Sequence, residues 1–374
     1  MATGTQLLAA YLLFWFALTT LLWLRRSESG EGKIAVTPLV VTWRTAFTFE
    51  SFARLRGSRL VGLLFDAGIV NMVLIMMAAY YVLASNLAYS LSTGRHVGVV
   101  APIIPGVTIG LRVFLYLLPG LVIAVLLHEA FHAMAARYEG IPVRSSGLML
   151  FLGLIPAAFV EPEEDALLRA PSRAKLRVFA AGVLANTLLF LLFSGLLLAV
   201  TSKGYYLAVS AAPGGVAERA GLPETLLLEK IVVNGSTFSD VGSFVKYVNK
   251  LRQEHGGSLR GVALVVEFVA IDGRVYKVYK PPEAPAIGIY LYSVPRALAS
   301  LGPGLALSLF LVLYYAQAIN IGLAGINALP IFITDGAQFI QAAVEKRVGA
   351  EMARKVATLA SAATIALLLP NISL

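Results

Sequence analysis

The sequence has no cysteine, and only 14% of its 374 residues are charged. The absence of cysteine excludes disulfide bonds, thiolate nucleophiles and cysteine-ligated zinc sites. The scarcity of charge excludes an ordinary soluble protein, in which about a quarter of the residues are charged. Hydrophobic residues make up 58% of the chain. We therefore predict an α-helical polytopic membrane protein that carries one small soluble module.

Basic residues outnumber acidic ones, with 30 lysines and arginines against 21 aspartates and glutamates. A basic protein can bind nucleic acid, but no stretch here alternates basic and aromatic residues as stacking on bases requires. We expect the basic residues to mark cytoplasmic loops and to contact the lipid bilayer, with no nucleic-acid partner.

Six apolar stretches have the length or near-length of a transmembrane helix. They are residues 7–24, 61–91, about 111–136, about 178–200, 303–329 and 356–369. The first ends in Arg25 and Arg26 instead of a small-residue cleavage site, which predicts an anchor and not a cleaved signal peptide. Basic residues in the loops after the first, third and fifth stretches place both termini outside the cytoplasm. We expect the protein to lie in the plasma (cell) membrane.

Residues 147–160 are apolar but too short to cross a bilayer, and Gly153 and Pro156 interrupt them. Backbone outside a helix is tolerated at membrane depth only when protein or a wet cavity surrounds it. We predict a re-entrant β-hairpin whose edge pairs with an extended substrate, with an interfacial loop as the alternative. Residues 35–43 are apolar and β-branched, and the sequence leaves open whether they lie on the membrane surface or pack against later helices.

From Ser202 to about Pro285 charges are frequent, and Asn234-Gly235 and Asp272-Gly273 signal turns. This pattern predicts a small α+β module outside the cytoplasm. The predicted domains are a first helix with a cytoplasmic segment (1–60), a transmembrane core (61–200), the module (201–286) and the rest of the core (287–374).

His128 and His132 flank Glu129 in an otherwise apolar helical stretch. Residues four apart share one face of a helix, so both imidazoles can bind one zinc ion, and Glu129 can reach a water on that metal. The alternative is a buried helix with two hydrogen-bonded histidines. Ionisable groups in a membrane-length helix favour the functional interpretation. His128 precedes Arg137 by nine residues, which places the site roughly 13 Å from the cytoplasmic surface and predicts a substrate within the membrane.

A catalytic zinc ion usually has three protein ligands and a water. Asp335 follows an apolar helix on the same side of the membrane, in a stretch broken by proline and glycine, and is one candidate for the third ligand. Glu161 and Glu163 are the rivals, and the residues alone leave the choice open. His96 lies on the outer side, and His255 lies in the module.

An ordered set of motifs resembles the site-2 protease family of intramembrane zinc metalloproteases. The motifs are His128-Glu-Ala-Phe-His132, Gly182-Val-Leu-Ala-Asn186, Asn327-Ala-Leu-Pro330 and Thr334-Asp335-Gly336, and residues 212–222 with 231–235 are similar to a PDZ domain. The resemblance implies that Asp335 is the third ligand, that the hairpin lies beside the site, and that Asn186 and Asn327 hold the substrate backbone or the reacting carbonyl. Two departures are Ala337, where glycine is frequent, and Leu228-Glu229, where Gly-Asp is frequent; the second puts peptide binding by the module in doubt.

These observations predict a membrane-embedded zinc endopeptidase with one Zn²⁺ per chain, Glu129 as the general base and transmembrane proteins as substrates. The rivals are another membrane zinc protease with a glutamate ligand, a catalytically idle scaffold and a transporter, although no inverted repeat is visible. The natural substrate, the upstream protease and the oligomeric state stay open.

Overall fold

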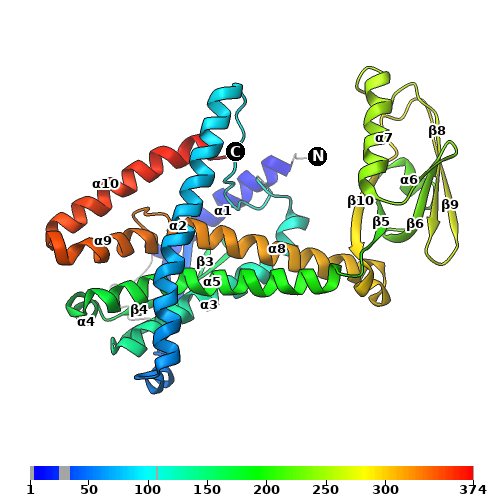
Figure 1. Ribbon diagram of the computed structural model, residues 1–374. Coiled ribbons are helices and arrows are strands. Elements are labelled where there is room, and N and C mark those ends of the chain that lie inside the picture. The colour runs from blue at the N-terminus through cyan, green and yellow to red at the C-terminus, as the bar shows by residue number, and fades with distance from the viewer. Residues whose placement is uncertain (1–3, 25–33, 107, 374) are drawn as a thin grey trace. The chain divides into compact units, whose positions relative to one another are not determined.

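The computed structural model describes residues 4–24, 34–106 and 108–373 (Figure 1). Arg25 and Arg26 lie outside the described residues. The chain divides into two compact units, one made of Met1–Leu192 with Tyr315–Leu374 and the other of Phe193–Tyr314. Each unit is described by itself.

Five helices within the described residues are long and apolar enough to cross a membrane. They are α2 (Arg59–Thr93), α3 (Leu111–Glu139), α5 (Ser172–Thr201), α8 (Pro303–Ala328) and α10 (Ala350–Leu368). These match five of the six predicted spans. The remaining one corresponds to α1 (Gly4–Leu24), and the count of six stays a prediction.

Short local signals set the ends and contacts of the core helices. Ser58 caps α2 by accepting a hydrogen bond from the Val61 N–H, and Gly140 ends α3 with φ 85°. A β-carbon on Gly120 of α3 would lie 2.6 Å from Cα of Ala316 on α8. Glycine therefore lets α3 and α8 approach closely. This approach brings the histidine motif on α3 near the Asn327-Ala-Leu-Pro330 motif at the end of α8.

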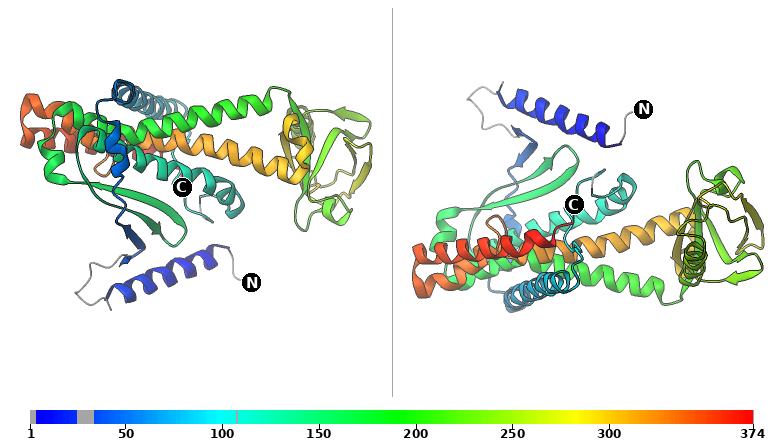
Figure 2. Two further views of the ribbon diagram at one scale, coloured as in Figure 1. Left: turned by 90° about the horizontal axis from the view of Figure 1, so that it is seen from below. Right: turned by 90° about the horizontal axis from the view of Figure 1, so that it is seen from above.

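The first unit also contains a four-stranded antiparallel sheet in the order β1-β2-β3-β4. Its strands are β1 (Ile34–Thr37), β2 (Val40–Thr45), β3 (Val143–Phe151) and β4 (Ile155–Pro162). Figure 2 shows β3 and β4 as a long hairpin, and the Tyr11 hydroxyl of α1 donates to the Leu152 carbonyl at its turn. The hairpin is present as predicted, and residues 35–43 belong to this sheet. Its depth in a membrane stays a prediction.

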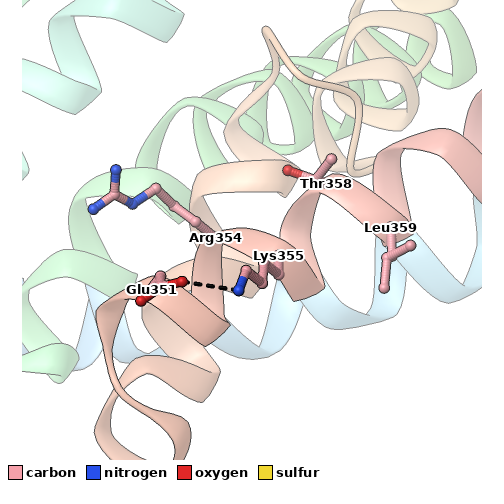
Figure 3. Close-up of a pocket in the computed structure, with 5 residues that line it drawn as sticks. All are labelled: Glu351, Arg354, Lys355, Thr358 and Leu359. Carbon is pink, nitrogen blue, oxygen red and sulfur yellow. Dashed lines mark ion pairs between the residues drawn. The ribbon is translucent and has the colours of Figure 1, made fainter.

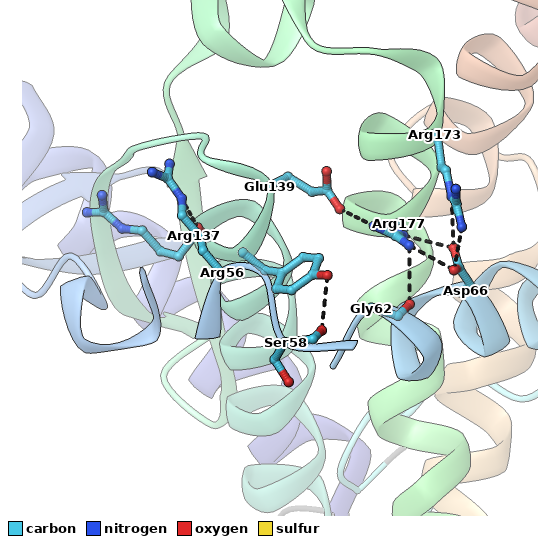
Figure 4. A network of polar contacts seen from close by, with 9 residues as sticks. Arg56, Ser58, Gly62, Asp66, Arg137, Glu139, Arg173 and Arg177 are labelled. Atoms are coloured by element: carbon cyan, nitrogen blue, oxygen red, sulfur yellow. Dashed lines mark hydrogen bonds and ion pairs between the residues drawn. The ribbon is translucent and has the colours of Figure 1, made fainter. Parts of the chain in front are cut away.

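A network of ion pairs connects one end of α2, α3 and α5 (Figure 4). Arg177 donates to both carboxylate oxygens of Asp66, at 2.9 and 2.8 Å, and to Glu139 at 2.7 Å. Arg173 also donates to Asp66, at 2.6 Å. Asp66 is thus a structural acid that holds helix ends together. Short elements η1 (Glu50–Leu55), α4 (Glu164–Arg169), α9 (Asp335–Val348) and η3 (Leu369–Asn371) complete this unit.

The second unit is built on a sheet in the order β10-β5-β6-β8-β9, with β7 paired to β6. A buried apolar cluster that includes Leu228, Phe244 and Phe268 forms its core. Asn234 and Gly235, predicted to turn, both have positive φ between β6 and β7. The elements are β5 (Tyr205–Ala211), α6 (Val216–Arg219), β6 (Leu226–Val233), β7 (Ser236–Phe238), α7 (Val241–Glu254), β8 (Leu264–Ala270), β9 (Val275–Lys280), β10 (Ile289–Pro295) and η2 (Arg296–Leu301).

The sheet of this unit extends beyond the predicted end of the module at residue 286. Strand β10 pairs with β5 along its whole length, from Ile289 opposite Ala211 to Pro295 opposite Tyr205. Three prolines precede β10, at positions 281, 282 and 285. Proline commonly ends regular structure, but here the proline-rich segment connects two strands of one sheet.

Candidate metal and catalytic site

Helix α3 carries both predicted histidine ligands on one face. His128 and His132 are buried, each with 8% of its surface exposed, and their ring nitrogens Nε2 lie 3.1 Å apart. The i, i+4 spacing produces this convergence directly from helix geometry.

Asp335 reaches the histidines through a tight turn between α8 and α9. The Thr334 hydroxyl donates to the carbonyls of Leu329 and Ile331. A β-carbon on Gly336 would lie 2.2 Å from the Ala328 carbonyl oxygen. A residue without a side chain is therefore required directly after Asp335, and the turn places Asp335 at the start of α9.

The three predicted ligands form a nearly equilateral triangle. Asp335 Oδ2 lies 3.1 Å from His128 Nε2 and 3.2 Å from His132 Nε2. Zinc bonds of about 2.0–2.1 Å in a tetrahedron require ligand atoms about 3.3 Å apart. Asp335 Oδ2 is also buried and lacks a hydrogen-bond partner among the described groups. The three atoms therefore fit three corners of a tetrahedral zinc site, with the fourth corner free for a water or a substrate.

Helix α5 fixes the orientation of His132. The Nδ1 atom of His132 lies 2.7 Å from the Val178 carbonyl oxygen, which can only accept a hydrogen bond. Nδ1 therefore carries the proton, and Nε2 presents its lone pair to the triangle. A carbonyl partner of this kind is usual for metal-binding histidines.

Asn186, also on α5, lies against the other histidine. Its Nδ2 is assigned 3.2 Å from His128 Nδ1, while its buried Oδ1 has no partner among the described groups. Amide oxygen and nitrogen are assigned from the hydrogen-bond network, and exchanging them places the amide oxygen against His128 Nδ1. The amide oxygen then accepts a proton from His128 Nδ1, which leaves Nε2 of His128 free for a metal.

Glu129 projects toward the hairpin. Its Oε2 accepts a hydrogen bond of 2.9 Å from the backbone N–H of Val160 on β4. Strand β4 therefore lies beside the site, as expected of the hairpin, and its backbone contacts the residue expected to act as the base.

The rival ligands lie elsewhere. Glu161 pairs with Ser145 and with Arg44, and among the described residues the group of His128, His132 and Asp335 is the metal-binding candidate, without Glu161 or Glu163. Asn327 is half-buried near the end of α8, and its side chain makes no hydrogen bond to His128, His132 or Asp335.

Three contacts at the site could not be derived from the sequence. The Val178 carbonyl and the Val160 amide are backbone groups, which no residue type signals. Gly182 belongs to a predicted motif, and the structure supplies its reason, because a β-carbon there would lie 2.4 Å from His128 Cε1 and from His132 Nε2.

Comparison with known proteins agrees with this geometry. An uncharacterised protein of Methanocaldococcus jannaschii, MJ0971, is 37% identical over 94 residues, which are 25% of this chain and 22% of that protein. The chain thus matches about a fifth of the length of this relative. A family model described as peptidase family M50 matches residues 116–370, a range that includes the two histidines, Asn186 and Asp335. The chain belongs to peptidase family M50, the site-2 protease family.

Proposed function

We propose that this protein is an intramembrane zinc metalloprotease that hydrolyses peptide bonds within transmembrane segments of other proteins. The observation that carries this proposal is the triangle of His128 Nε2, His132 Nε2 and Asp335 Oδ2 on and beside an apolar helix of membrane-spanning length. A hydrolytic metal site within such a helix suits a substrate that is itself in the membrane.

His128, His132 and Asp335 would hold one Zn²⁺, which supplies Lewis-acid polarisation of the scissile carbonyl and acidifies a bound water. Glu129 accepts the proton of the attacking water and delivers it to the leaving amine. Val178 and Asn186 hold the two imidazoles in the tautomer that binds metal. Asn327 is the remaining candidate for a contact with the substrate backbone or the developing oxyanion, a role that Asn186 would share if its amide turned from His128.

The substrate must be locally extended at the cut, because helical hydrogen bonds shield its carbonyls. Strand β4 is the edge of its sheet, and an extended segment can add to such an edge through backbone hydrogen bonds. We propose that the hairpin β3–β4 is re-entrant and that the cell-membrane protein has its site toward the cytoplasm.

We propose that the second unit is an extracytoplasmic PDZ-like domain that binds or filters substrates. A groove of about 340 Å³ lies between α7 and β10. Strand β10 is at one edge of the sheet of this unit, and it pairs with β5 on one side and with no described strand on the other. Apolar side chains of Phe244, Val248 and Ile289 line it, which suits an extended peptide end. If the domain binds peptide, Val248→Lys should weaken substrate docking. If the domain acts as a size filter, Val248→Lys should have no effect, and cleavage should depend only on the size of the substrate's ectodomain.

The principal test uses the full-length protein in lipid nanodiscs with a panel of transmembrane peptides. We expect cleavage that a zinc chelator abolishes and added zinc restores. Glu129→Gln should bind the same amount of zinc as the wild type and lose cleavage, because it removes the base and leaves the three ligands. Glu129→Gln with wild-type turnover would refute the assigned role, and chelator-resistant cleavage would refute the zinc mechanism.

A further inference from the structure

The outer edge of β4, which pairs with no strand among the described residues and faces Glu129 of α3, has a short and defined set of hydrogen-bond donors. In an antiparallel pair, successive residues of a strand point their N–H groups alternately toward and away from the partner. Val160 is paired in register with Ser146 of β3, yet its N–H bonds Glu129. The backbone N–H of Val160 therefore points away from β3, and so do the backbone groups of every second residue from Val160 along β4.

Two prolines limit the number of N–H donors on this edge. The residues that share the outward register with Val160 are Pro156, Ala158 and Pro162. Proline has no N–H, and within sheets it is confined to positions that do not bond a neighbouring strand, which independently supports the same register. Between the two prolines, only Ala158 and Val160 present an outward N–H.

One of these two donors is already engaged. Val160 donates to Glu129 Oε2 at 2.9 Å, and Glu129 directly follows the ligand His128. An extended chain that pairs with the β4 edge needs the same Val160 N–H for one of its carbonyl oxygens. The carboxylate and the substrate backbone therefore compete for a single donor.

We propose that the Val160 N–H holds the Glu129 carboxylate when no substrate is present and transfers to a backbone carbonyl of an extended peptide when one binds. Ala158 provides the second contact, so the recognised element is an extended segment with two β4-facing carbonyls spaced two residues apart. Its arrival frees Glu129 beside the metal ligands. The proposal rests on the proposed proteolytic function and adds a coupling between substrate docking and release of the base.

The test measures binding, not turnover. A transmembrane peptide that the wild-type protein cleaves is labelled with a fluorophore, and its affinity for the full-length protein is measured in nanodiscs after zinc is removed equally from every variant. Glu129→Ala removes the competitor, so we expect it to bind the peptide about 2- to 10-fold more tightly than the wild type, the worth of one net hydrogen bond. Glu129→Gln keeps an acceptor oxygen and should show little of this gain.

A double-mutant cycle then assigns the gain to one donor. Val160→Pro removes the contested N–H and should weaken binding and abolish the gain from Glu129→Ala. Val160→Ala keeps the N–H and should preserve the gain. Ala158→Pro should weaken binding by a similar factor with and without Glu129, because its N–H is not shared.

The outcomes separate this proposal from the proposed function. If the wild type cleaves the peptide but Glu129→Ala binds no more tightly, or gains equally in the Val160→Pro background, the coupling is refuted while proteolysis stands. If no transmembrane peptide is cleaved by the wild type, the proposed function itself fails. The comparison of Glu129→Ala with Glu129→Gln does not depend on the folding of the proline variants.

Discussion

Gly182 lies so close to His128 that a β-carbon on the glycine would be 2.4 Å from Cε1 of the imidazole. The same β-carbon would lie 2.4 Å from His132 Nε2. One residue of α5 thus lies directly against both imidazole rings, on the side of their Nε2 atoms, and its lack of a side chain permits the triangle of His128, His132 and Asp335.

Gly182→Ala should therefore displace both imidazoles and lower the zinc affinity by at least about 10-fold. Zinc content of the purified protein, measured by elemental analysis after limited chelation, provides the readout. Gly195→Ala is the matched control, because the same helix has open space around that position. Equal zinc content in the two variants would show that the contact is not needed.

Asn186 should act through His128 if its amide oxygen accepts the Nδ1 proton. Asn186→Ala is expected to lower zinc affinity by about 10- to 100-fold, the usual effect of losing a partner of a metal ligand. Asn186→Asp keeps an oxygen acceptor and should retain more affinity. Competition with a chromophoric chelator measures both variants.

Asn71→Ala is the control for this prediction. It removes a half-buried amide that bonds α5, but the partner of that amide is the Thr187 hydroxyl, at 3.1 Å. Zinc affinity should be unchanged. If Asn186→Ala bound zinc normally and cleaved poorly, a role toward the substrate would be favoured instead.

Arg177 should be the more important arginine of the pair that binds Asp66. Its side chain is 11% exposed, whereas that of Arg173 is 68% exposed. Arg177→Met leaves Glu139 and Asp66 short of a partner and should cost about 3 kcal/mol in the free energy of unfolding. Arg173→Met should cost less than about 1 kcal/mol. Reversible unfolding in mixed micelles compares the two, and equal losses would contradict the assignment.

The proposed topology can be tested without background, since the chain has no cysteine. Figure 3 shows Arg354 directed away from the ion pair of Glu351 and Lys355, which are 2.8 Å apart. Arg354→Cys leaves that pair intact. A membrane-impermeant maleimide should label Ser239→Cys in intact cells, and Arg354→Cys only after the membrane is opened. The reverse pattern would invert the topology.

Much of the architecture follows from local sequence patterns. Five apolar stretches form long helices, the hairpin forms where Gly153 interrupts an apolar segment, and Asn234-Gly235 turns between two strands. Each of these features depends on hydrophobic length or on residues within a few positions of one another. The strand pairing of residues 35–43 with β3, and the inclusion of β10 in the sheet of the second unit, depend on remote partners and were not predicted.

The sequence by itself determined five long apolar helices, through their hydrophobic length. It also determined the pair of histidines and the neighbouring glutamate, because helix periodicity brings positions four apart onto one face. Only the tertiary structure decided that Asp335 and not Glu161 meets those histidines, that Asn186 lies on His128, and that Glu129 bonds the Val160 amide. Periodicity states which face of an element a side chain occupies. Which distant element packs against that face depends on close backbone approaches, such as those at Gly120, Gly182 and Gly336, that no local pattern encodes.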